Sequence, residues 1–256
     1  MKKRFFSAMF ILMLTGFMAP AVTSPQAQKQ APQQRLSPEE MIKAFAAKES
    51  EFYEAWIQYT YKQVATIRVL SVDGVETNER MVLVWEVLFR DDGQREIRLV
   101  DRGGRLRSVL WTEDDEEVIT NLQPFALTSK DLPLYDLKYE GKERVDELET
   151  YVFSVKPKST KGGKYYFQGR IWVDDRDLQI VRTLGKVVPQ KKENQFPEFE
   201  TLREIIDDKY WFPTWTHADS VLRFPGQSVR VEETITYEEY KRFGSKVSIQ
   251  PIPPLP

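Results

Sequence analysis

Cysteine is absent from this sequence of 256 residues, and histidine occurs once. Without cysteine there is no disulfide, no thiolate metal site, no cysteine nucleophile and no lipid-modified N-terminal cysteine. An excess of basic charge is absent too, because 37 Lys and Arg residues stand against 39 Asp and Glu residues. A nucleic-acid partner requires a basic surface, so this balance argues against nucleic acid. What the chain does have is a 12% share of aromatic residues, which predicts a substantial core or an apolar cavity.

The first residues have the pattern of a secretory signal peptide. Residues 2–4 are basic, and residues 5–18 are almost all apolar. This run is shorter than the roughly 20 residues that cross a membrane, which argues against the alternative of a retained anchor. We predict a signal peptide over residues 1–21, with cleavage after residue 21 or 27, and export to the periplasm.

Composition divides the remaining chain into three parts. Residues 22–36 are rich in Gln, Ala and Pro without periodicity, which predicts a flexible linker. Residues 37–248 are expected to form a single domain. Residues 249–256 form a proline-rich tail that cannot join a central strand.

An amphipathic helix is predicted over residues 38–57. Ser37 and Glu40 have the spacing of a capping box, and Pro38 suits the first helical position. Apolar residues then recur at helical spacing, with charged residues between them. These apolar residues are Met41, Phe45, Phe52 and Trp56.

Beyond the helix the apolar period changes to two, which is typical of strands. Turn signals separate the runs; one of them, Gly103-Gly104, would lead into a strand over residues 106–111. Counting gives about ten sequential, and therefore antiparallel, strands. The acidic and proline-containing segment 114–141 interrupts them and is expected to be a short helix or loop that covers something. Either a sandwich or a strongly curved sheet would bury the apolar faces, and the single helix favours the curved sheet.

The hairpin around residues 174–177 has two distinct faces. Ile171 and Val173 lie before the turn and Ile180 after it, and all three are predicted to face inward. Trp172 then falls on the polar face. Either it packs under a neighbouring loop, or the inward face of this strand is wrongly assigned.

No motif predicts catalysis or metal binding. His217 and Asp219 share one face of a predicted strand, but no Gly-x-Ser-x-Gly motif supplies a nucleophile. The acidic clusters at 114–117, 174–177 and 207–208 lack the EF-hand pattern, and Asp is favoured in turns. We therefore predict no enzyme, no cofactor and no metal. The alternative hypothesis of a periplasmic hydrolase would require that His217 and Asp219 converge with a Ser or Thr in a cavity.

Six strand-and-turn segments follow one another in a characteristic order: Tyr61-Lys62-Gln63, 84–93, 141–157, 169–174, 208–213 and 236–243. Their order resembles that of the LolA-like group of bacterial periplasmic proteins, which includes the outer-membrane lipoprotein-sorting carriers. The resemblance spans most of residues 38–248.

The resemblance implies a mainly β fold: a strongly curved antiparallel sheet, or incomplete barrel, with the N-terminal helix and a short helical or loop lid on its concave side. It also implies a monomeric, non-enzymatic carrier for lipoprotein sorting and outer membrane biogenesis. Its cavity would hold acyl chains of a lipoprotein or lipid, exchanged with a membrane-associated donor or acceptor protein. Such carriers latch the lid with a strand arginine, which we cannot assign in this sequence. The alternative is an envelope sensor or regulatory module of the same fold that binds a protein partner.

An apolar cavity with a movable lid binds an acyl chain reversibly, because burying apolar area contributes about 25 cal/mol per Å². The helix residues expected against this cavity are Met41, Phe45, Phe52 and Trp56. The residues expected to line it are Leu83, Trp85, Val87, Phe89, Ile97, Leu99, Phe153, Ile171, Val173, Ile180 and Ile235.

Overall fold

The computed structural model describes residues 36–71, 73–90, 92–192 and 195–243. The predicted signal peptide with its cleavage site, the predicted linker up to residue 35 and the predicted tail lie outside the described residues. Within the described ranges, no helix is both long enough and apolar enough to span a membrane.

The N-terminal helix α1, Pro38–Trp56, begins as the capping box predicts. The Glu40 amide donates to Ser37 Oγ at 3.3 Å, and the Ser37 amide donates to Glu40 Oε2 at 2.8 Å. The two bonds satisfy amides that the first helical turn leaves without partners. The apolar stripe of α1 is buried, from Met41 at one end to Trp56 at the other.

Ten strands follow in the described part of the chain, and all neighbours pair antiparallel. The sheet has the order β3-β2-β1-β10-β9-β8-β7-β6-β5-β4. The first and last strands therefore pair in the interior of the sheet, while β3 and β4 form unpaired edges, so the barrel is incomplete. The strands are β1 Tyr59–Leu70, β2 Glu76–Phe89, β3 Arg95–Arg105, β4 Tyr135–Val145, β5 Leu148–Pro157, β6 Tyr166–Asp174, β7 Ile180–Val188, β8 Phe199–Ile206, β9 Tyr210–Phe224 and β10 Gln227–Arg242.

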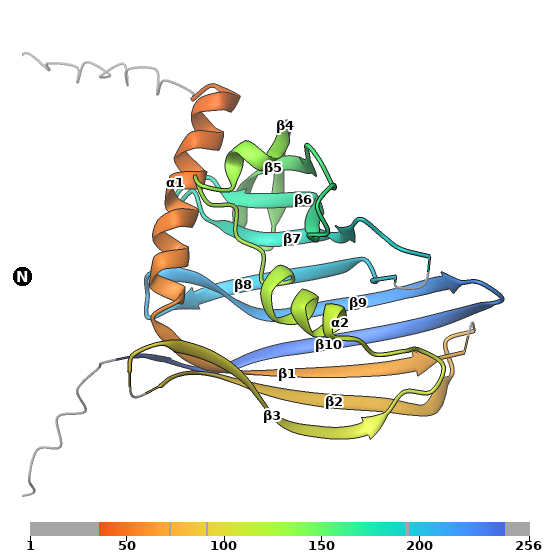
Figure 1. Ribbon diagram of the computed structural model, residues 1–256. Coiled ribbons are helices and arrows are strands. Elements are labelled where there is room, and N and C mark those ends of the chain that lie inside the picture. The colour runs from red at the N-terminus through yellow and green to blue at the C-terminus, as the bar shows by residue number, and fades with distance from the viewer. Residues whose placement is uncertain (1–35, 72, 91, 193–194, 244–256) are drawn as a thin grey trace, which may run out of the picture. The chain divides into compact units, whose positions relative to one another are not determined.

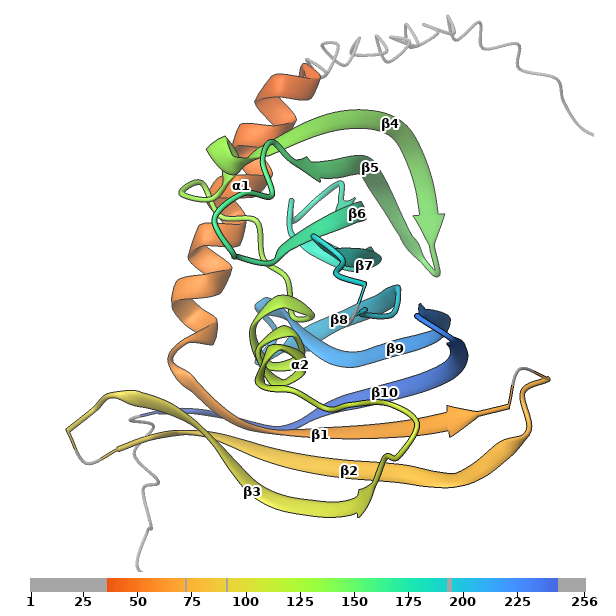
Figure 2. The same ribbon diagram turned by 45° about the vertical axis from the view of Figure 1, so that its right-hand side comes forward.

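The sheet curves around a short helical segment between β3 and β4. This segment contains the helix α2, Glu113–Glu117, and the π-helix η1, Val118–Leu122, while a 3₁₀ turn η2, Leu132–Leu134, leads into β4. Figure 2 shows α2 inside the curve, between the strands β4 to β7 and the strands β1 to β3. Figure 1 shows α1 running across the strands along one side of the sheet. The predicted fold class, with a lid on the concave side, is confirmed.

Two strand predictions were wrong. Residues 106–111 form no strand, because β3 continues through Gly103 and Gly104, which pair with Val82 and Met81. A Cβ on Gly104, at φ +75°, would lie 2.1 Å from the Arg80 carbonyl oxygen, so glycine here serves close strand contact and not a hairpin turn.

The second error concerns β4, which lies largely within the segment that was expected to be a covering helix or loop. Its inward Tyr135, Leu137 and Tyr139 alternate with charged residues. Charged side chains are common on edge strands, where they discourage pairing with other chains. Only the first half of the interrupting segment therefore covers the sheet.

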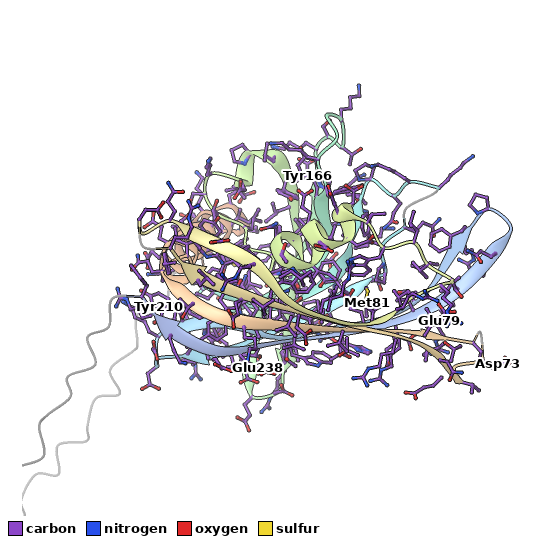
Figure 3. The ribbon with its side chains drawn as sticks, turned by 60° about the horizontal axis from the view of Figure 1, so that its bottom comes forward. Asp73, Glu79, Met81, Tyr166, Tyr210 and Glu238 are labelled. Atoms are coloured by element: carbon purple, nitrogen blue, oxygen red, sulfur yellow. The ribbon has the colours of Figure 1, made fainter. Side chains whose placement is uncertain are left out.

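The core is divided between the two faces of the sheet. Two large apolar clusters lie on the concave face, and a small third one lies on the convex face. Figure 3 shows the two faces through Met81, which lies on the covered side of the sheet, and Glu238, which lies on the opposite side.

The convex cluster explains Trp172, whose exposed fraction is only 2%. The ring packs against two valines of neighbouring strands, and its indole N–H donates to Glu143 at 2.9 Å. The guanidinium groups of Arg170 and Arg182 lie 4.8 Å and 4.4 Å from the ring centre. The inward assignment of Ile171 and Val173 is therefore compatible with a buried tryptophan on the other face.

Candidate functional site

The concave face brings most of the predicted cavity residues together in the two large clusters. The first cluster, over β1, β2, β9 and β10, holds Leu83, Trp85, Val87 and Ile235 with Phe52 and Trp56 of α1. The second, over β5 to β8, holds Phe153, Ile171, Val173 and Ile180 with Met41 and Phe45 of α1.

Three predicted cavity residues lie at the margin of the first cluster. Ile97 is partly buried against it. Phe89 is half-buried and stacks on Phe243, with ring centres 4.2 Å apart. Leu99, on the edge strand β3, is 37% exposed. The structure therefore does not bring these three side chains into the centre of the concave face.

Protein side chains fill most of the concave interior. A cavity of about 30 Å³ remains beneath η1, which is room for about two water-sized groups. The predicted lining residues thus pack against α1 and the lid, here defined as residues 113–127, and not around an open acyl-sized space.

A larger groove of about 310 Å³ lies beside the lid, between α1 and the chain that leads into β4. The walls of this groove include the aromatic residues Tyr53, Trp56, Phe125, Tyr135, Tyr165 and Tyr166. Tyr166 is labelled in Figure 3.

Polar side chains interrupt the apolar rows of the concave face, and several of them bond to the lid. Gln63 of β1 donates to the Ile119 carbonyl at 2.9 Å. The Thr201 hydroxyl of β8 donates to the Gln123 carbonyl, also at 2.9 Å. All these groups are buried, so each bond satisfies a lid group that would otherwise lack a partner. We call Gln63, Thr201, Arg203 and Glu233 the lid tethers.

Arg203 is the most connected lid tether. Its Nη1 and Nη2 donate to Glu49 Oε1 and Oε2 of α1 at 3.0 Å and 3.2 Å, and Nη2 also donates to the Phe125 carbonyl. The guanidinium carbon lies 4.2 Å from the centre of the Phe52 ring. The side chains of Arg203 and Glu49 are 1% and 0% exposed, so this strand arginine joins α1, the lid and β8 through one buried ion pair.

Glu233 of β10 is the acidic lid tether. It accepts a hydrogen bond from the Gln123 side-chain amide and is 4% exposed. Burial raises the pKa of Glu233 to about 7, and Asp115 of α2 adds to the shift by charge repulsion. Burial also raises the pKa of Asp115.

Sequence reasoning missed these residues, although a signal was present. Glu49 lies four residues after Phe45 and three before Phe52, on the apolar stripe of α1. Glu233 lies between inward Val231 and Ile235 at period two. A polar residue at an otherwise apolar position is the signal that would have identified each of them.

His217 and Asp219, the pair on which the alternative of a hydrolase depended, do not lie in the concave interior. His217 faces the convex side, stacks on Trp215 and contacts the Thr234 hydroxyl at 3.4 Å. Asp219 is instead held by Arg230. In the part of the chain that the structure describes, no three His, Asp or Glu side chains gather as metal ligands would.

Comparisons with known proteins find similarity in fold only. No family model and no curated protein matches the chain. A DUF1329 family protein from Desulfovibrio piger has 17% identity and a TM-score of 0.40, over 80% of this chain and 94% of that chain. A protein domain from Vibrio parahaemolyticus, provisionally named for outer membrane lipoprotein sorting, has 10% identity and a TM-score of 0.38, over 80% and 93%.

A LolA superfamily protein from Nitrosomonas europaea has 13% identity and a TM-score of 0.33, over 77% of this chain and 93% of that chain. Such distant similarities carry no conclusion about a ligand. The functional proposal below therefore depends on the residues of this chain.

Proposed function

We propose that this protein is an exported, non-enzymatic binding protein that shields acyl chains of a lipid or lipoprotein between its curved sheet and its lid. The supporting observation is the concave face, which is mainly apolar and is covered by α1 and the lid.

The closed interior fits a reversible carrier. Exposing the concave face to water is unfavourable in proportion to its apolar area, at about 25 cal/mol per Å². The lid therefore covers the face when no ligand is bound. An acyl chain that replaces the contacts of the lid keeps the face dry, and this burial offsets part of the free energy needed to displace the lid.

The lid tethers determine how readily this exchange occurs. The lid contributes Ile119 and Phe125 to the apolar core, and the Phe125 ring stacks on Phe167 of β6 with centres 4.4 Å apart. Arg203 adds a charged bond to the same lid segment. The aromatic groove beside the lid provides the first contact surface for an acyl chain.

The test is to purify the mature protein from its native host and to identify co-purifying lipids by mass spectrometry. A fluorescent fatty acid is then titrated into the delipidated protein, with urea-unfolded protein as the control for non-specific binding. We expect an acyl-containing ligand in the first experiment and saturable binding in the second. Failure of both would contradict the proposal.

The second candidate is a sensor or regulatory module that binds a protein partner. The unpaired edge strand β3 favours it, because a free edge can pair with an extended segment of another chain. This strand carries four arginines, so the partner segment would be acidic. A variant with Pro at Leu99, within β3, should lose such a partner but keep acyl binding.

A further inference from the structure

The cavity of about 30 Å³ beneath η1 has apolar walls and a polar end. It lies between the inner face of β1, β9 and β10 and the chain from Leu106 to Gln123. Its apolar walls include Ile67, Trp111, Ile119, Leu222 and Val231.

At the polar end of the cavity, one buried hydrogen-bond acceptor has no donor. Gln123 Nε2 donates a hydrogen bond to Glu233 Oε1. Gln123 Oε1, in contrast, is buried and has no hydrogen-bond partner. Glu233, which also lines the cavity, accepts the bond from Gln123 Nε2 and is 4% exposed. Gln123 is 1% exposed, so water outside the protein does not satisfy it. Asp115, which also lines the cavity, accepts through Oδ2 from the amide and the hydroxyl of Thr112.

The electrostatics of this end favour a positive group. None of the described residues that line the cavity is basic. A buried carboxylate without a cation is unstable, and it either gains a proton or attracts a positive partner. Consistent with this, burial raises the pKa of Glu233 to about 7.

We infer that the cavity is a head-group subsite for an amphiphile that carries a primary ammonium group on an apolar chain. The inference rests on the proposed function and adds the polar end of its ligand. Because Ile119 and Gln123 of the lid line the cavity, the head group binds with this part of the lid in place, and the chain displaces only the remainder of the lid. The N–H groups of the ammonium donate to Gln123 Oε1 and Glu233, and its charge pairs with the carboxylate. The cavity of about 30 Å³ has room for the ammonium head group, and the chain follows the apolar walls outward.

The test compares three probes of equal length, decylammonium, decanol and decanoate, by calorimetric titration of the full chain at pH 8. Decylammonium should bind about tenfold more tightly than decanol, as one charge-assisted hydrogen bond provides, and decanoate should bind weakest. Decyltrimethylammonium keeps the charge but has no N–H group, and should bind less tightly than decylammonium.

Glu233→Gln should abolish the preference for decylammonium over decanol. Glu232→Gln is the matched control, because Glu232 is the next residue, contacts Arg68 at 3.5 Å and faces the other side of the sheet. The control should keep the preference. If Glu233→Gln does not fold, the wild-type protein provides the same test by a change of pH. Lowering the pH from 8 to 5.5 protonates Glu233 but leaves the ammonium charged. The preference for decylammonium over decanol should then fall.

The outcomes separate the two proposals. Equal affinity for the three probes, or a preference that survives both Glu233→Gln and low pH, overturns the inference and leaves the acyl-binding proposal standing. Binding of none of the probes contradicts the proposed function itself.

Discussion

Two arginine–carboxylate pairs, each joined by two hydrogen bonds, lie on opposite faces of the sheet. On the concave face Arg203 binds Glu49, and the two side chains are 1% and 0% exposed. On the convex face Arg230 binds Asp219 at 2.8 Å and 2.6 Å, and the two side chains are 30% and 34% exposed. Water screens the outer pair, whereas the inner pair is shielded from water. We therefore expect the outer ion pair to contribute little to stability, and the inner ion pair to hold the lid and α1 on the sheet.

The largest expected effect comes from breaking the inner pair. Arg203→Met keeps the bulk of the side chain but leaves Glu49 buried without a cation, which should lower the free energy of unfolding by about 3–5 kcal/mol. Urea denaturation measures it. Glu49→Met combined with Arg203→Met should recover much of this loss, because no buried charge remains.

Arg230→Met is the matched control on the convex face. The change in its unfolding free energy should lie close to the error of the measurement, because Asp219 remains in contact with water. Equal effects of Arg203→Met and Arg230→Met would contradict the distinction between the two faces.

The next largest effect concerns pH. The pKa of Glu233 is raised from 4.5 to about 7 by burial, so the folded state holds its proton over a pH range in which the unfolded state has lost it. The stability of the wild type should therefore fall as the pH rises from about 4.5 toward 7. Thermal unfolding at pH 5 and pH 8 should show this fall, and Glu233→Gln should reduce it. If Glu232→Gln reduced it equally, Glu233 would not be its source.

A smaller effect distinguishes two neighbouring threonines on the concave face. Thr201 and Thr183 are paired across β8 and β7, and both are buried. The Thr201 hydroxyl holds the lid, whereas the Thr183 hydroxyl has no partner in the described part of the chain. Thr201→Val should lower the free energy of unfolding by about 1 kcal/mol, and Thr183→Val should leave it unchanged or raise it slightly. The opposite order in urea denaturation would contradict the tether role of Thr201.

Local patterns in the sequence predicted much of the fold. The Ser37–Glu40 capping box gave the start of α1, and period-two runs gave the curved antiparallel sheet. The continuation of β3 past Gly103-Gly104 could not be read locally, because it depends on the approach of the Arg80 carbonyl from another strand. The edge strand β4 was missed because charge is frequent along it.

The candidate site was predictable only in part. Apolar periodicity assigned residues such as Trp85 and Ile171 to the inner side, where both are buried. It could not pair Glu49 with Arg203, since 154 positions separate them in the chain. Their positions within apolar rows mark them as exceptional, but only the folded sheet shows that they meet.

Hydrogen exchange over lid residues 118–127, with and without a fluorescent fatty acid, tests the central claim most directly. Ligand that displaces the lid should accelerate exchange of these amides, while the paired amides of β1 and β10 stay protected. Arg203→Met should accelerate exchange of the same amides without ligand. Saturable acyl binding with unchanged lid exchange would contradict the account, because the chain would then hold its ligand elsewhere than beneath the lid.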